Sequence, residues 1–273
     1  MLKKILSDKP TRLLMFFSAF FVANALIAEC IGNKLFSLEN LFGYQPQPFS
    51  LFGEQGLTFA LNCGVLLWPI EFVMTDIVNE YYGPKIVRRI SFIAIGLLLY
   101  AFVCFFVSIK LPPDTSFWTG SQQKSGVPDM QSAFSNIFGQ GMWIIAGSLT
   151  AFLCSQIIDV SIFHRIKRMT GEKHVWLRAT GSTFISQLFD SFIVLFIAFK
   201  IGKDWSWQRV LAIGLINYSY KFVMAIVLTP LIYLVEKWID TYVGKETATR
   251  MKNVAMGKED EGAVIIADSI TAG

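Results

Sequence analysis

Long apolar stretches alternate with shorter polar segments along most of the chain. Six of the apolar stretches are long enough to cross a hydrocarbon core of about 30 Å, which takes about 20 helical residues. They cover approximately residues 13–31, 57–78, 90–109, 142–163, 179–199 and 210–235. The pattern predicts an all-α fold: a polytopic membrane protein built as a bundle of six transmembrane helices.

The polar segments set the predicted domain organisation. Residues 1–12 form an N-terminal segment, and residues 13–238 form the transmembrane domain. Prolines and glycines mark an outer loop at about residues 110–136. Residues 239–273 are expected to form a polar tail, for which disorder is an open alternative.

Composition and charge agree with a membrane protein. Of the 273 residues, 53% are hydrophobic and 16% are charged, and the mean hydropathy is +0.50; a soluble domain carries about 25% charged residues. Most lysines and arginines lie near the two termini and in segments 85–89 and 165–178, which by the positive-inside rule face the cytoplasm. The net charge of +4 therefore predicts contact with anionic lipid and gives no reason to expect nucleic-acid binding.

The cysteines and histidines give no sign of a disulfide framework or a metal site. The cysteines fall singly in predicted helices, and the histidines lack an acidic or cysteine partner at metal-binding spacing. We therefore expect no metal and no cofactor. These residues are Cys30, Cys63, Cys104, Cys154, His164 and His174.

Polar residues inside the predicted helices are the candidates for function. The string TDIVNEYYG (75–83) sets Asp76, Asn79 and Glu80 three and four residues apart, on one helical face. An intramembrane carboxylate costs about 2.5 to 3.5 kcal/mol on insertion scales, so it needs a partner or a function. Glu80 could simply pair with Arg88 or Arg89 at the surface, and this interpretation is favoured over direct ligand contact.

A second pattern, S-Q-x-x-D, occurs twice, at 155–159 and at 186–190. It contributes Gln156, Asp159, Gln187 and Asp190, and it reflects either an inverted repeat or chance. Counting about 1.5 Å per helical residue places Asp190 near mid-membrane. Three further polar residues, Lys221, Asn24 and Glu71, reach a similar depth. Asp190 and Lys221 could be a structural ion pair or could bind a solute.

Several motifs together resemble one known family. Residues 69–89 follow the pattern P-x5-T-D-x-x-N-E-x-x-G-x4-R-R, and SLTAFLCSQIIDVSIFHRIK (148–167) and WLRATGSTFISQLFDSFIVLFIAF (176–199) follow in order. The last helix adds Asn217-Tyr218, Lys221 and Thr229-Pro230. On these residues, over about 13–238, the chain resembles the queuosine precursor transporters, also called the vitamin uptake transporter family.

The resemblance implies a multi-pass importer in the bacterial inner membrane, not an enzyme. Its solutes would be 7-deazaguanine precursors of queuosine, such as 7-cyano-7-deazaguanine or 7-aminomethyl-7-deazaguanine. A carboxylate can accept the paired N–H donors of such a base, while an amide or Lys221 can donate to its carbonyl. Trp68, Tyr81, Phe184 and Phe189 are candidates for stacking on the ring. The family's polar positions fall on Asp76, Asn79, Glu80, Gln156, Asp159, Gln187, Asp190 and Lys221.

Two other classes stay open. One is the substrate-binding subunit of an energy-coupling-factor vitamin importer, whose ATPase module would then be a partner, since this chain has no G-x-x-x-x-G-K-[ST] loop of its own. The other is an intramembrane enzyme that uses two aspartates as acid and base, although the chain has no GxGD motif. Secondary or facilitative transport of a small molecule is preferred to both, and a homo-oligomer is left open.

Overall fold

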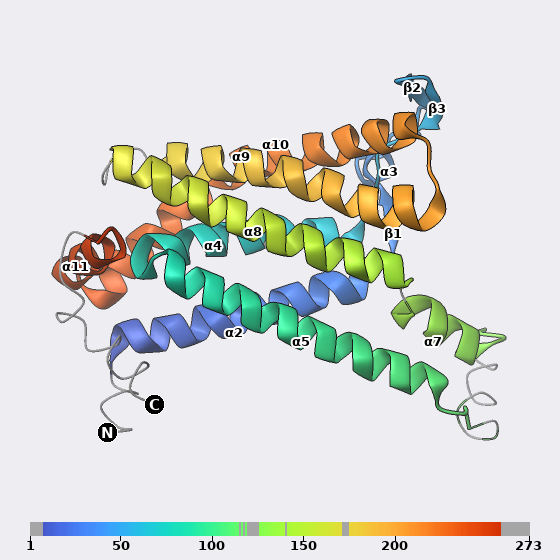
Figure 1. Ribbon diagram of the computed structural model, residues 1–273, viewed down its shortest axis with the longest axis horizontal. Helices are drawn as coiled ribbons and strands as arrows, with labels where there is room; N and C mark the ends of the chain where they lie inside the picture. The colour runs from blue at the N-terminus through green and yellow to red at the C-terminus, as the bar shows by residue number, and fades with distance from the viewer. Residues whose placement is uncertain are drawn as a thin grey trace.

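The computed structural model describes residues 8–114, 116, 118, 126–139, 141–170 and 175–257. Within these residues, five helical segments are long and apolar enough to cross a membrane. They run side by side along an elongated bundle (Figure 1), which confirms the predicted all-α, polytopic membrane class. The long elements are α2 (Lys9–Ile31), α5 (Pro84–Lys110), α8 (Met142–Thr170), α9 (Val175–Leu195), which continues as the π-helix η3 (Phe196–Ile201), and α10 (Trp207–Val243).

The second predicted span differs from its expected form. Residues 57–78 do not make one helix: a short strand β4 (Ala60–Asn62) and a 3-10 turn η1 (Cys63–Leu66) come first, and helix α4 runs from Trp68 to Tyr82. Pro69 fixes the start of α4, because proline lacks an N–H and is tolerated only in the first turn. Gly83, with φ of +80°, ends it. A sixth membrane crossing therefore stays a prediction.

Helix α4 is the central element of the bundle. All but three of its fifteen residues are buried, and it contacts α2, α5, α8, α9 and α10. Apolar residues of these helices form the main core, which includes Phe17, Val73, Ile77 and Phe163. The polar face of the TDIVNEYYG string therefore points into protein and not toward lipid.

One end of the bundle carries two small antiparallel sheets that the sequence did not reveal (Figure 1). Strand β1 (Leu35–Ser37) pairs with β4, and β2 (Phe49–Leu51) pairs with β3 (Glu54–Leu57). The short helix α3 (Leu38–Leu41) follows β1. The Phe59 amide and the Ser37 hydroxyl donate to the Glu39 carboxylate at 2.8 and 2.7 Å, and these hydrogen bonds hold the pKa of Glu39 below its usual value.

The predicted outer loop is partly helical. Helix α7 (Met130–Phe138) occupies its second half, and Asp129 caps the helix by accepting from the Ser132 amide. Helix α7 lies at the same end of the bundle as the strands (Figure 1). Residues 115, 117 and 119–125 of this loop lie outside the described part of the chain.

The opposite end differs from the expected polar tail. Helix α10 continues to Val243, and after Gly244, at a φ of +93°, helix α11 runs over Lys245–Ala255. Ala248 and Met251 of α11 are buried, because α11 packs against α4 and α10. This part of the tail is therefore ordered helix and not disordered chain. Residues 1–7 and 258–273, the rest of the predicted terminal segments, lie outside the described residues.

Candidate functional site

A cleft lies between α4, α9 and α10. It contains about 370 Å³ of empty space, part of it open to the surroundings. Its lining includes apolar residues such as Phe72 and Leu228, and its main polar groups are Asp76 from α4, Gln187 from α9 and Lys221 from α10. A mainly apolar cleft with a few placed polar groups is the usual form of a small-molecule site.

Asp76 and Gln187, which line this cleft, each carry a hydrogen-bonding atom without a described partner. Both are only 3% exposed, yet Oδ1 of Asp76 and Nε2 of Gln187 have no hydrogen-bond partner among the described residues. A buried polar atom without a partner costs about 1–3 kcal/mol, and such atoms in a native structure are rare. An acceptor and a donor without described partners therefore lie on residues that form the walls of the cleft.

Helical spacing explains why these side chains share the cleft. On α9, Thr180, Thr183 and Gln187 are three and four residues apart and line the same wall. On α4, Phe72 and Asp76 are four apart and line the facing wall. The aromatic side chain in the cleft is therefore Phe72, and the predicted stacking candidates Trp68, Tyr81, Phe184 and Phe189 are not among the lining residues.

Lys221 and Asp190 form an ion pair between α10 and α9. The contact places both groups at one depth, as the residue count predicted. Ser155 of α8 also donates toward Asp190, at 3.4 Å. Because Lys221 lines the cleft as well, its ammonium group lies between a fixed carboxylate and the space available to a ligand.

The two S-Q-x-x-D motifs meet across the α8–α9 contact. Ser186 of the second motif donates to Asp159 of the first at 3.0 Å, and Ser155 of the first donates to Asp190 of the second. The contacts are reciprocal, as a two-fold relation between antiparallel helices requires. Gln156 accepts from the Thr75 hydroxyl of α4 at 3.2 Å, so the first motif also holds the central helix.

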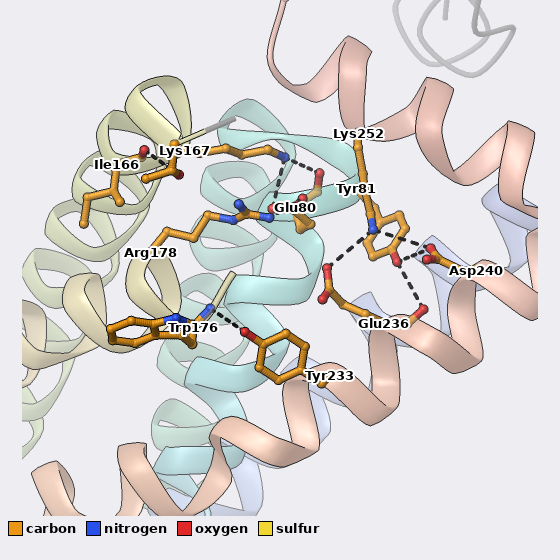
Figure 2. Close-up of polar contacts among 11 residues, drawn as sticks. Glu80, Tyr81, Ile166, Lys167, Trp176, Arg178, Tyr233, Glu236, Asp240 and Lys252 are labelled. Carbon is orange, nitrogen blue, oxygen red and sulfur yellow. Dashed lines mark hydrogen bonds and ion pairs between the residues drawn. The ribbon is translucent and has the colours of Figure 1, made fainter. Parts of the chain in front are cut away.

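Glu80 is not at the surface, and the prediction that it pairs with Arg88 or Arg89 is wrong. It is 1% exposed, and its carboxylate lies 2.8 Å from Arg178 Nη2 and 3.2 Å from Lys167 Nζ (Figure 2). Lys167 also donates to the Glu80 carbonyl at 2.6 Å. Arg88 instead donates to Ser161.

Lys167 and Arg178 are functional candidates that the sequence analysis missed. It assigned them to a basic cytoplasmic loop, but they are 0% and 1% exposed. A signal was present, since Asp159, Phe163 and Lys167 are spaced by four and share one face of α8. Arg178 also lies over the Phe163 ring, 5.9 Å from its centroid. Asp76 lies within electrostatic range of Glu80, Asp159 and Arg178.

Asn79 lies between Asp76 and Glu80 in the sequence of α4. It is 0% exposed, and neither its amide nitrogen nor its amide oxygen has a hydrogen-bond partner in the described structure. It does not line the cleft.

Asn24 and Glu71 form a separate contact. The Asn24 amide donates to Glu71 Oε2 at 2.8 Å and to the Leu67 carbonyl at 3.2 Å, which fixes the start of α4 against α2. Neither residue lines the cleft. Glu29, which the sequence analysis did not single out, is likewise buried and accepts from Ser148 of α8. These contacts point to a role in packing the helices.

The described residues contain no group of three or more His, Cys, Asp or Glu side chains able to hold a metal ion. His174 lies outside them. The four cysteines are free and half-buried.

The chain matches a known family over most of the bundle. Residues 62–235 match the family model described as "Putative vitamin uptake transporter". The chain belongs to this family. Its matched region begins at Asn62, the last residue of β4, and includes α4, α8, α9 and most of α10. It therefore contains the whole cleft, whereas α2 and α11 lie outside it.

Relatives in this vitamin uptake transporter family carry a more specific name. A "Probable queuosine precursor transporter" of Bacillus subtilis (strain 168) is 33% identical over 187 residues, 67% of this chain and 74% of the relative. The "Queuosine precursor transporter" of Escherichia coli (strain K12) is 29% identical over 63% of this chain and 70% of its own length. A "Probable queuosine precursor transporter" of Haemophilus influenzae is 23% identical over 63% of this chain and 66% of the relative. No solved structure matches the chain.

Proposed function

We propose that this chain imports a 7-deazaguanine precursor of queuosine, such as 7-cyano-7-deazaguanine or 7-aminomethyl-7-deazaguanine, as a secondary or facilitative transporter. The observation that carries the proposal is a pair of unpartnered atoms, Asp76 Oδ1 and Gln187 Nε2, on two residues that line the cleft. The names of the relatives from three bacteria support the solute class.

The chemistry of the cleft suits such a base. A deazaguanine carries a ring N–H and an exocyclic amine on one edge, beside a carbonyl. Asp76 would accept from the paired donors, and Gln187 or Lys221 would donate to the carbonyl. Phe72 and the aliphatic wall would cover the ring faces. A solute without these donors would leave buried polar atoms unpaired and would bind less tightly.

The remaining polar residues are proposed to act around the cleft. Asp159, Gln156 and Asp190 would hold the helices that form it, through Ser186, Thr75 and Lys221. Glu80 and Asn79 would act in translocation, one helical turn from Asp76. Asn24 and Glu71 lie away from the cleft, so we propose for them a packing role that the transport path depends on.

We further propose that the end of the bundle with α11 faces the cytoplasm of the inner membrane. The start of α2, the end of α8, the start of α9 and α11 lie at this end (Figure 1), and each of these segments carries basic residues. The strands and α7 would then lie on the outer side.

Uptake by cells tests the proposal. Labelled 7-cyano-7-deazaguanine should accumulate in cells that lack their own synthesis and express this chain, and not in matched cells with an empty vector. Collapsing the proton gradient would separate secondary from facilitative transport. No uptake of any 7-deazaguanine would refute the proposal, and uptake that requires a co-purifying ATPase would assign the chain to an energy-coupling-factor importer.

A further inference from the structure

Helix α11 closes one end of the bundle by packing across α4 and α10. Ala248 and Met251 are its buried face. Ala255 approaches Gly83, the residue that ends α4, closely: a side chain at Gly83 would come within 3.4 Å of the Ala255 backbone. The helix therefore covers the point where the central helix of the bundle ends.

A single lysine ties α11 to the other two helices. Lys252 Nζ lies 3.5 Å from both Glu236 Oε1 and Asp240 Oδ1 of α10, and 4.7 Å from the centre of the Tyr81 ring of α4 (Figure 2). Tyr81 in turn donates its hydroxyl to Asp240 at 2.6 Å. One ammonium group thus binds α4 and α10 at the same time.

The residue before Tyr81 is Glu80, which Lys167 and Arg178 hold from α8 and α9 (Figure 2). Two successive residues of α4 are therefore fixed to four other helices. Asp76, one turn earlier, lines the cleft. The ionic contacts thus lie between the cleft and the α11 end of the bundle.

The contacts of Glu80 form an inner layer and those of Lys252 an outer layer, and the two layers differ in how readily they can break. The side chains of Glu80, Lys167 and Arg178 are at most 2% exposed, and opening this layer would leave charges buried without partners. Lys252 is 15% exposed, and its partners Asp240 and Glu236 are 34% and 9% exposed, so water reaches these contacts more readily than those of Glu80. The outer layer is the one suited to reversible opening.

We propose that α11 is a latch, with Lys252 as its binding group, that holds α4 and α10 together and closes the path from the cleft at this end. Release of Lys252 from Glu236, Asp240 and Tyr81 would let the ends of α4 and α10 separate and open the cleft toward the α11 side. This inference rests on the proposed transport function. Because α11 lies outside the matched residues 62–235, the latch is an addition to the shared core.

Access to the cleft from the α11 side tests the latch directly. The reporter is a cysteine at Ala225, a cleft-lining position, in the full chain with its four native cysteines replaced by serine. The protein is placed in vesicles, and a membrane-impermeant maleimide is added on the α11 side. Lys252→Met should raise the labelling rate about 5-fold or more, because the open state becomes more populated. Lys252→Arg, which keeps the charge, should stay near the parent rate.

Lys245→Met is the matched control, since it makes the same change at an exposed position of the same helix. If Lys252→Met does not fold, the double variant Glu236→Gln, Asp240→Asn removes the same contacts from α10 and carries the same expectation. Labelling rates equal to the parent rate in the folded variants would overturn the latch.

Binding of labelled 7-cyano-7-deazaguanine to the same purified proteins separates the two proposals. Faster labelling in variants of a chain that binds no deazaguanine would leave the latch standing and refute the solute assignment. Binding of the base together with unchanged labelling rates would support the solute assignment and refute the latch.

Discussion

Asp76 and Gln187 line one cleft from two helices, and each carries a buried polar atom that makes no hydrogen bond within the described structure. One atom is an acceptor and the other a donor. The predictions about the solute follow from this acceptor and donor. The predictions about buried charges follow from two sets of ion pairs, Asp190 with Lys221 and Glu80 with Lys167 and Arg178.

Asp76→Asn should abolish uptake and leave the protein folded. The change keeps the size of the side chain but exchanges a carboxylate for an amide, so a charge-assisted hydrogen bond worth about 1.5–3 kcal/mol is lost, or roughly 10- to 100-fold in affinity. Binding and thermal unfolding of the purified protein would measure both effects. The control is Asp204→Asn, at an aspartate whose side chain is 94% exposed. Unchanged uptake would reduce Asp76 to a structural residue.

Gln187→Met should separate binding from stability. The side chain keeps about the same volume but loses the amide nitrogen that has no described partner. Affinity for the base should fall about 10-fold, while the free energy of unfolding should change by less than about 1 kcal/mol. A large loss of stability with unaltered affinity would mean that the amide serves the fold.

Removal of both charges of the Asp190–Lys221 pair should be tolerated better than removal of either one. Asp190→Asn or Lys221→Met alone leaves a buried charge unpaired, at a cost of about 3–5 kcal/mol. The double variant should fold yet fail to transport, since Lys221 also lines the cleft. Transport at the normal rate by the double variant would show that the pair is only structural.

Glu80→Gln should be strongly destabilising. It leaves Lys167 and Arg178 without their shared carboxylate, and breaking such a buried network typically costs about 3–5 kcal/mol. Arg88→Gln, at a basic residue whose described contact is a long hydrogen bond to Ser161, should change stability little. Chemical denaturation of both variants would decide between this account and surface pairing of Glu80, which predicts small changes of similar size in both variants.

Reporter fusions should place both termini and the 80–89 and 164–178 segments in the cytoplasm, as the basic residues require. A fusion within 164–178 that reports an outside location would reverse the proposed orientation, and with it the side on which α11 opens the cleft.

The sequence predicted the apolar helices well because their length and hydropathy are local properties. It failed where apolarity does not specify a conformation. Leu57 and Leu61 are apolar and buried, but they lie in strands, and Pro69 delays the start of α4. The sequence analysis likewise placed Lys167 and Arg178 in a solvated loop. It could not predict their burial, because that depends on a partner, Glu80, which lies far away in the sequence.

The candidate site, too, could be predicted only in part from the sequence. Asp76, Gln187 and Lys221 could be named from intramembrane polarity and a family resemblance. Which polar residues share a cleft and which fix helices depends on the rotation of each helix about its axis. Glu71 was predicted to share a depth with Asp190, but it faces Asn24 of α2 and not the cleft, so a prediction from depth alone could not exclude it from the site.

The reciprocal links of Ser155 to Asp190 and of Ser186 to Asp159 have a mechanical consequence. A slide of α8 past α9 by one turn, about 5.4 Å, would break both links at once, and two attachment points also resist rotation of one helix against the other. Helices α8 and α9 should therefore move as one rigid unit. Because Glu80 also holds α4 to α8 and α9 through Lys167 and Arg178, relative motion during a transport cycle would then fall mainly on α10.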